Sequence, residues 1–191
     1  MSKLRVGFAM CGSFCTFNKI IPIIKQLSDN GADVFPIMSQ TAAYTNTRFG
    51  SSVEFREQIE TICDKEIITT IEQAEPIGPR KLLDILIVEP CTGNTLGKLA
   101  NGITDTSVTM AVKAHLRNER PVLIAVSTND GLTASAKNIG KLQNSKNIYF
   151  VPYTQDDSYN KPASLVADFD KTMVAMHLAL EGKQMQPLLI K

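Results

Sequence analysis

Residues 85–102 read ILIVEPCTGNTLGKLANG, and this stretch decides the fold class. Its first four residues, Ile85–Val88, are all apolar, which is typical of a strand buried on both faces of a parallel sheet. Glu89-Pro90 is expected to end that strand, and the pattern over Thr92–His115 predicts a helix. An apolar strand followed by a small polar turn and a helix is the repeating unit of an α/β fold.

The same unit recurs on both sides of this stretch. A strand is predicted at Leu4–Met10 and a helix at Phe17–Asn30, where Asn30-Gly31 supplies an ordinary C-terminal stop. This order of elements predicts a doubly wound α/β domain with a mainly parallel sheet. The other expected elements are a strand at Asp33–Met38, a helix from a Ser51–Glu54 capping box to about Cys63, a short strand at Glu66–Thr70, a loop at Gln73–Arg80, a strand at Pro121–Val126, a helix ending near Leu142, a last strand at Asn147–Val151 and a terminal helix at Ala163–Leu180.

Composition excludes several classes of protein. The chain has 191 residues, 43% hydrophobic and 20% charged, which is ordinary for a globular domain. Twenty Lys and Arg against 19 Asp and Glu give a net charge of +1, and there is no Trp. Because phosphate-backbone binding needs a basic field, we expect no nucleic-acid partner. No stretch approaches the roughly 20 apolar residues of a membrane span, so we expect no membrane partner and a cytoplasmic protein.

The cysteines and the N-terminus are interpreted in the same way. Four cysteines are too few for a secreted disulfide scaffold, and the chain has only two histidines. We therefore expect reduced thiols and no metal site, while the role of Cys11 and Cys15 is left open. The apolar run Val6–Cys11 follows two basic residues, but it is short and runs into Gly12-Ser13. It is interpreted as a buried strand rather than a signal peptide.

Small polar residues follow four of the predicted strands. In open parallel sheets, ligands bind beyond the carboxyl ends of the strands, where helix N-termini supply free N–H groups and a positive dipole. One such group alone is ordinary helix-capping chemistry. Four at one edge of one sheet indicate a binding site. The four segments are Gly12-Ser13, Ser39-Gln40-Thr41, Cys91–Thr95 and Ser127–Asn129.

The residue types in these segments indicate the ligand. The dinucleotide motif G-x-G-x-x-G is missing after the first strand, which favours a mononucleotide. Hydroxyls at Ser13, Ser39 and Thr41 suit a terminal phosphate beside a helix N-terminus. Thr92, Asn94 and Thr95 offer donors and acceptors for the edge of a ring. An FMN-like ligand fits both halves of this set.

Three of these segments resemble a known family, the homo-oligomeric flavin-containing cysteine decarboxylases. The family's first turn, T-G-S-I-A-A-Y-K, is loosely matched by Cys11–Lys19, and its M-S-x-x-A by Met38–Ala42. The most specific match is Glu89–Asp105, against the family pattern A-P-A-S-A-N-T-x-A-K-x-A-N-G-x-x-D. The likeness continues to about Asn129. It implies one flavoprotein-like domain over residues 1–191 with a Rossmann-like or flavodoxin-like fold.

The resemblance also implies roles for individual residues. An FMN cofactor would have its phosphate on the first two turns and its isoalloxazine on the third, and Ser127 of the fourth segment is a further candidate to bind it. Asn94 and Asn129 are the candidates for a catalytic role. The cofactor-binding candidates are Gly12, Ser13, Ser39, Thr41, Thr92, Gly93, Asn94, Thr95 and Ser127, and the substrate-binding candidates are Asn94, Lys98, Thr128 and Asn129.

Within this group, the chain looks most like the flavoprotein subunit of a two-component oxidoreductase. Such a flavoprotein works with a partner that carries its own NADP- or NAD-binding domain. Together they oxidise a dihydropyridine dicarboxylate to an aromatic product during sporulation. The resemblance implies a homo-oligomer in the cytoplasm of the mother cell. A dicarboxylate needs cationic partners, and Lys98 and Arg80 are the candidates.

Three other interpretations stay open. The first is an FMN-dependent decarboxylase of a cysteinyl or related substrate that acts alone. The decarboxylases carry a histidine where this chain has Pro76–Arg80, and the missing histidine argues against this activity. The second is a non-catalytic FMN-fold subunit that regulates a partner. The third is an α/β domain with well-capped helices and no flavin.

Overall fold

Within residues 3–190, which the computed structural model describes, seven strands form one sheet in the order β2-β1-β3-β4-β7-β6, with β5 also paired to β4. The first five strands pair in parallel, and β7 joins β4 and β6 in antiparallel fashion. The fold is therefore α/β with a mainly parallel sheet, as predicted. The strands are β1 (Arg5–Met10), β2 (Asp33–Met38), β3 (Ile85–Cys91), β4 (Val122–Thr128), β5 (Ile148–Phe150), β6 (Tyr153–Asp157) and β7 (Lys161–Ala167).

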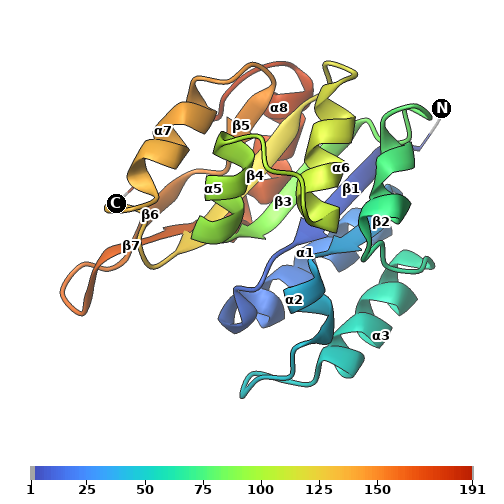
Figure 1. Cartoon of the computed structure of the whole chain (residues 1–191), viewed down its shortest axis with the longest axis horizontal. Coiled ribbons are helices and arrows are strands. Elements are labelled where there is room, and N and C mark those ends of the chain that lie inside the picture. Colours follow the sequence, from blue (N-terminus) through green and yellow to red (C-terminus); the bar gives the residue numbers. More distant parts are fainter. Residues whose placement is uncertain (1–2, 191) are drawn as a thin grey trace.

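Helices cover both faces of the sheet. In Figure 1, α5, α6 and α7 lie on the near face, and α1 and α8 lie on the far face. The chain passes from β1 outward to β2 and then returns to β3 on the other side of β1, so the strand order switches between β1 and β3. Ligands of doubly wound folds bind at such a switch point. The helices are η1 (Phe14–Thr16), α1 (Phe17–Asp29), α2 (Gln40–Tyr44), α3 (Ser52–Cys63), α4 (Ile71–Ala74), η2 (Glu75–Ile77), α5 (Gly93–Ala100), α6 (Ser107–Leu116), α7 (Ala136–Gln143), η3 (Phe169–Lys171) and α8 (Thr172–Leu180).

The central strands carry the core. Every residue of β3 is buried, and β4 is buried up to its last residue. Helix α1 contributes a stripe of buried side chains that includes Ile20, Ile24 and Leu27, which is the face that its sequence predicted. His115 of α6 is also buried, and its Nε2 lies 3.1 Å from the carbonyl oxygen of Pro121. Burial lowers the pKa of His115 to about 4, so the ring is neutral at pH 7.

The first half of the sheet follows the predictions closely. The strand at Asp33–Met38 has the predicted bounds, and the strand predicted at Leu4–Met10 begins one residue later. The prediction that Glu89-Pro90 ends the third strand is wrong, because β3 continues to Cys91. A register shift against β4 lies between Val88 and Cys91, which is where a sheet tolerates a proline. The carbonyl of Pro90 still accepts a hydrogen bond from the N–H of Cys11, at 3.2 Å.

The single helix predicted over Thr92–His115 is two helices. Helix α5 ends at Ala100, and Gly102 adopts a left-handed φ of +69° that favours glycine. Helix α6 begins after Thr106, whose side chain accepts the N–H of Thr109 in a capping box. The hydrophobic periodicity is continuous over Thr92–His115, but Gly102 and the N-cap Thr106 divide the segment into two helices.

The segment between α3 and β3 also differs from prediction. The short strand expected at Glu66–Thr70 is only an isolated bridge between Ile37 and Ile68. The loop expected at Gln73–Arg80 holds the end of α4 and all of η2, because Thr70 and Gln73 form a capping box. The N-cap of α3 is Ser51 as predicted, but its hydroxyl accepts from the N–H of Val53. Helix α2, which the sequence did not predict, begins directly after β2.

The C-terminal part was predicted wrongly. The helix expected over Ala163–Leu180 begins only at Thr172, and residues 163–167 belong to β7. Strand β7 closes the hairpin with β6 and pairs with the end of β4 at Ser127 and Thr128. Tertiary pairing with β4 thus overrides a local sequence pattern that is typical of a helix. The strand predicted at Asn147–Val151 exists as β5, but it is not the last strand.

Candidate active-site cleft

A cleft of about 1390 Å³ lies at the carboxyl edge of the parallel strands. It is bounded by the turn after β1, the start of α5, the loop after β4 and one side of the β6–β7 hairpin. Three of the four polar segments singled out in the sequence therefore meet in one place. The predicted site residues in its wall are Gly12, Ser13, Thr92, Gly93, Asn94, Ser127, Thr128 and Asn129.

Two serines join the ends of strands that are not neighbours. The hydroxyl oxygens of Ser13 and Ser127 lie 2.8 Å apart, although β3 separates β1 from β4. The carbonyl of Ser13 accepts a hydrogen bond from the hydroxyl of Thr16, at 2.7 Å, which fixes the turn into η1. This turn leads into the N-terminal end of η1 and α1, where backbone N–H groups lack helical partners. Hydroxyls and free N–H groups thus share one wall of the cleft.

The start of α5 is packed closely against the loop after β4. Thr92 is the N-cap of α5, and its hydroxyl oxygen accepts the N–H of Thr95. A Cβ atom on Gly93 would lie 2.7 Å from the hydroxyl oxygens of Thr128 and Ser135 and 2.6 Å from Asp130 Oδ1. Real Cβ atoms do not approach oxygens so closely, so only glycine fits at position 93 without a shift of this wall.

Two amide side chains are available to a ligand. Asn94 on α5 and Asn129 after β4 are both exposed in the wall of the cleft. Among residues 3–190, neither side chain makes a hydrogen bond to another protein group. Each amide can both donate and accept. These two residues are therefore suited to bind the edge of a polar ring.

Other predicted residues lie beside the cleft or away from it. The hydroxyl of Thr95 is buried and donates to the sulfur of Cys11 at 3.2 Å, behind the wall. Ser39 is the N-cap of α2, and the methyl group of Thr41 lies 3.5 Å from where a Cβ on Gly12 would be. Ser39 and Thr41 therefore adjoin the first turn without lining the cleft.

The two predicted cations do not reach the cleft. Lys98 Nζ lies 2.8 Å from Asp105 Oδ1, in an ion pair on the exposed side of α5. Arg80 is exposed in the turn before β3, so it lies at the amino edge of the sheet, opposite the cleft. The hypothesis that these residues bind substrate carboxylates finds no support in this arrangement.

The structure instead supplies cleft residues that sequence reasoning missed. Lys19 of α1 and the pair Arg48-Phe49 between α2 and α3 line one side. Lys161 of β7 and Asp156 of β6 come from the hairpin, which the sequence had assigned in part to a helix. The sequence signal for Arg48 and Phe49 was a basic and an aromatic residue directly before a glycine, Gly50.

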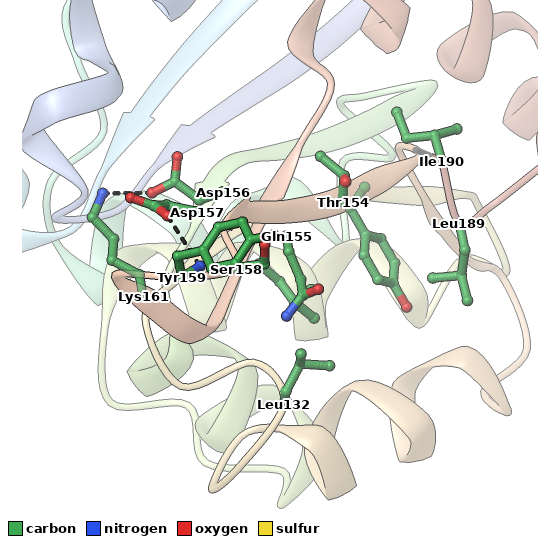
Figure 2. A pocket seen from close by; sticks show the side chains of 12 residues that line it. Leu132, Thr154, Gln155, Asp156, Asp157, Ser158, Tyr159, Lys161, Leu189 and Ile190 are labelled. Atoms are coloured by element: carbon green, nitrogen blue, oxygen red, sulfur yellow. Dashed lines mark hydrogen bonds and ion pairs between the residues drawn. The ribbon is translucent and has the colours of Figure 1, made fainter.

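The hairpin also has an outer side. Figure 2 shows a second pocket there, of about 890 Å³, formed by the hairpin together with Leu132, Leu189 and Ile190. Lys161 Nζ contacts Asp156 Oδ2 at 2.6 Å, so this ammonium group is already neutralised within the hairpin. The two pockets share Asp156, Lys161 and Leu165, so the hairpin forms a thin wall between them.

Titratable groups are also buried behind the cleft. Glu89 of β3 is fully buried, and its Oε2 accepts a hydrogen bond of 2.8 Å from the hydroxyl of Thr172. Its Oε1 has no partner among the described residues. Burial raises the pKa of Glu89 to about 8, so the carboxyl group is mainly protonated at pH 7. Burial likewise raises the pKa of the Cys91 thiol.

Comparison with known proteins identifies the family. A profile described as "Flavoprotein" matches residues 1–179, which is nearly the whole chain. The chain belongs to the flavoprotein family. The resemblance inferred from the sequence is thereby confirmed at the level of the family.

Two similar proteins carry the same name, the B subunit of dipicolinate synthase. The chain is 43% identical over 187 residues to the protein of that name from Bacillus subtilis (strain 168), covering 98% of this chain and 94% of that protein. It also superposes on the crystal structure of the B subunit from Bacillus halodurans C with a TM-score of 0.91. In that comparison the identity is 41%, and the match covers 100% of this chain and 99% of the other.

A more distant structure shares the fold alone. The FMN-dependent cysteine decarboxylase SpaF superposes with a TM-score of 0.68 and 21% identity, over 93% of this chain and 95% of SpaF. Among residues 3–190, no helix is long and apolar enough to cross a bilayer, and no three or more His, Cys, Asp or Glu residues are grouped so that they could hold a metal ion.

Proposed function

We propose that this chain is the flavoprotein subunit of a dipicolinate synthase. It would bind FMN and, together with the A subunit of that enzyme, oxidise dihydrodipicolinate to dipicolinate. The observation that carries the proposal is the 43% identity to a dipicolinate synthase protein over almost the full length of both chains. The cleft supports it, because the polar segments at the carboxyl ends of β1, β3 and β4 meet there.

The donor set fits FMN. A phosphate is suited to the turn at Ser13, where a hydroxyl, helix N–H groups and the nearby Lys19 combine neutral and charged donors. Ser39 and Thr41 adjoin that turn and would complete this part of the site. Bound FMN supplies an acceptor for two electrons and a proton, which the protein side chains cannot provide.

The remaining cleft residues would position the ring system and the substrate. Thr92, Gly93 and Thr95 shape the wall behind the isoalloxazine, and Ser127 extends that wall toward the first turn. The exposed amides of Asn94 and Asn129 would hold the dihydropyridine ring by its polar edge. Aromatisation removes two hydrogens from that ring. The chain's own contribution is therefore binding and orientation.

The partner and the assembly are part of the same proposal. The partner would carry the NADP- or NAD-binding domain and receive the reducing equivalents. The chain, a single flavoprotein-like domain over residues 1–191, would act as a homo-oligomer in the cytoplasm of the sporulating mother cell. Neither nucleic acid nor a membrane takes part in this scheme.

Decarboxylation by the chain alone is less well supported. Among the described residues, neither histidine lines the cleft: His115 is a buried residue of α6, and His177 lies on α8. Residues 76–80 follow α4 and lie before β3, at the other edge of the sheet. The cleft therefore offers no imidazole base. Release of CO₂ from a cysteinyl substrate by the purified chain would nevertheless favour this second function.

Reconstitution tests the proposal. The chain would be mixed with its partner, FMN and NADP or NAD, and dipicolinate formation from dihydrodipicolinate would be followed by chromatography. We expect turnover only with both proteins present, and a loss of at least about tenfold for Asn94→Ala. Thr133→Ala, a substitution on the exposed loop after β4, is the control. Equal turnover by the partner alone would contradict the proposal.

A further inference from the structure

The charged groups of the cleft are divided between its two sides. Lys19 and Arg48 come from elements that follow β1 and β2. The other side is lined by Lys161 and by four acidic residues, Asp130, Asp156, Asp168 and Asp170. Two of these acids are already in ion pairs, Asp156 with Lys161 and Asp168 with Lys171. An anionic ligand would therefore be attracted to the β1–β2 side rather than to the other.

On the cationic side, Arg48 has no charged partner among the described residues. Its guanidinium carbon lies 4.9 Å from the ring centroid of Phe49, in a cation–π contact. Among residues 3–190, its guanidinium makes no ion pair or hydrogen bond. Lys161 across the cleft is instead paired with Asp156. The five N–H donors of Arg48 are thus available to a ligand.

The turn that carries Arg48 and Phe49 is held in place. Thr47 and Gly50 exchange two backbone hydrogen bonds of 3.2 Å, and the N–H of Phe49 donates to the hydroxyl of Thr47 at 3.1 Å. Gly50 has a φ of +153°, and a Cβ there would lie 2.6 Å from the ring of Phe55. The backbone of this turn therefore rests directly on an aromatic side chain.

That side chain connects the turn to the core. The ring of Phe55 packs edge-on against Phe17, with 5.2 Å between the centroids, and Phe17 lies 5.3 Å from Phe14. Phe14 itself lines the cleft. Phe49 is 40% exposed, so a large aromatic surface faces solvent at the cleft. A fixed turn with a free guanidinium and an open ring is suited to recognise a planar anion.

We propose that Arg48 and Phe49 recognise the carboxylate-bearing ring of the substrate. Arg48 would bind one carboxylate through two parallel N–H···O bonds, and Phe49 would pack against the ring plane. The inference rests on the proposed function for the identity of the ligand. A phosphate of FMN shares the anionic chemistry that Arg48 prefers, so the two ligands must be measured separately.

Calorimetric titration of the chain tests this assignment. The probes are pyridine-2,6-dicarboxylate and, in a separate titration, FMN. Arg48→Gln should weaken dicarboxylate binding about 10- to 100-fold, because it removes a charge-assisted pair. Its FMN affinity should stay within about twofold of wild type, within the usual scatter of surface substitutions. Arg48→Lys should recover only part of the loss, because a point charge does not replace the bidentate fork.

Two further variants sharpen the test. Phe49→Leu keeps apolar bulk without the aromatic face, and it should weaken dicarboxylate binding about 3- to 10-fold. Arg117→Gln removes the same charge at the exposed end of α6, far from the cleft, and should leave both affinities unchanged. Circular dichroism would verify that each variant is folded.

The outcomes separate this inference from the proposed function. A loss of FMN affinity in Arg48→Gln without a loss of dicarboxylate affinity assigns Arg48 to the phosphate and overturns the inference. Equal dicarboxylate affinity in wild type and Arg48→Gln also overturns it, as does wild-type protein that binds no dicarboxylate. Failure of wild-type protein to bind FMN contradicts the proposed function instead, and the dicarboxylate series still decides the role of Arg48.

Discussion

Replacing Glu89 with glutamine should change how the stability of the protein depends on pH. The carboxyl group is fully buried, accepts one hydrogen bond from Thr172 and leaves its other oxygen without a partner among the described residues. Burial raises its pKa from 4.5 to about 8. Between pH 4.5 and 8, the carboxyl group of Glu89 therefore keeps its proton in the native state but is ionised in the unfolded state.

The sign and size follow from proton linkage. Between pH 4.5 and 8 the unfolded state binds fewer protons at this site, so the carboxyl group lowers the free energy of unfolding as pH rises. Each pH unit well inside this window corresponds to about 1.4 kcal/mol. From pH 5.5 to 7.5 the loss is about 2.5 kcal/mol, slightly below two full units, because the native group begins to ionise at the alkaline end.

Glu89→Gln removes the titrating carboxyl group and therefore its contribution to the pH dependence of the free energy of unfolding. The difference in unfolding free energy between the variant and wild type should shift by about 2.5 kcal/mol in favour of the variant between pH 5.5 and 7.5. The contribution of His115 is common to both proteins and cancels in the difference. Urea unfolding at several pH values measures it, with Glu57→Gln on the exposed side of α3 as a control for removing a carboxyl group. A pH-independent difference would refute the reasoning.

Three glycine positions give further predictions, each checked by thermal unfolding and, for the first pair, by FMN titration. Gly93→Ala should destabilise the protein by about 1–3 kcal/mol and abolish FMN binding, because its Cβ would lie 2.6–2.7 Å from three oxygens. Gly97→Ala on the same helix is its control, with one ordinary contact at 3.5 Å to Asn138, and FMN binding should persist. Gly140→Ala in α7 meets nothing within 4 Å and should raise stability by about 0.5–1 kcal/mol. A loss of stability in Gly140→Ala, or retained FMN affinity in Gly93→Ala, would contradict these assignments.

The parallel part of the fold could be predicted because its strands are buried on both faces. Ile85–Val88 and Asp33–Met38 are largely apolar runs bounded by polar turns, so local pattern and tertiary position agree. The β6–β7 hairpin could not be predicted in this way. Within residues 163–167, the strand pairs with β6 on one side and, at Leu165 and Val166, with the distant strand β4 on the other, and the apolar pattern of the segment alone does not encode this pairing.

Some residues of the candidate site could likewise be predicted from the sequence, and others could not. Residues at the ends of β1, β3 and β4 could be found because the carboxyl ends of parallel strands meet at one edge. The charge of Lys98 indicates a carboxylate-binding role, but Asp105 lies close enough to pair with it. Arg48 and Phe49 were missed because they follow no strand. Their position depends on the contact between Gly50 and Phe55, which only the folded structure reveals.

The proposed function depends on FMN binding in the cleft. The most direct test is to purify the chain, record its visible absorption spectrum and then titrate the colourless fraction with FMN while following flavin fluorescence. We expect a flavin spectrum or saturable, one-to-one quenching by wild type, retained by Gly97→Ala and lost in Gly93→Ala. A colourless, folded protein that leaves the fluorescence of added FMN unchanged would contradict it.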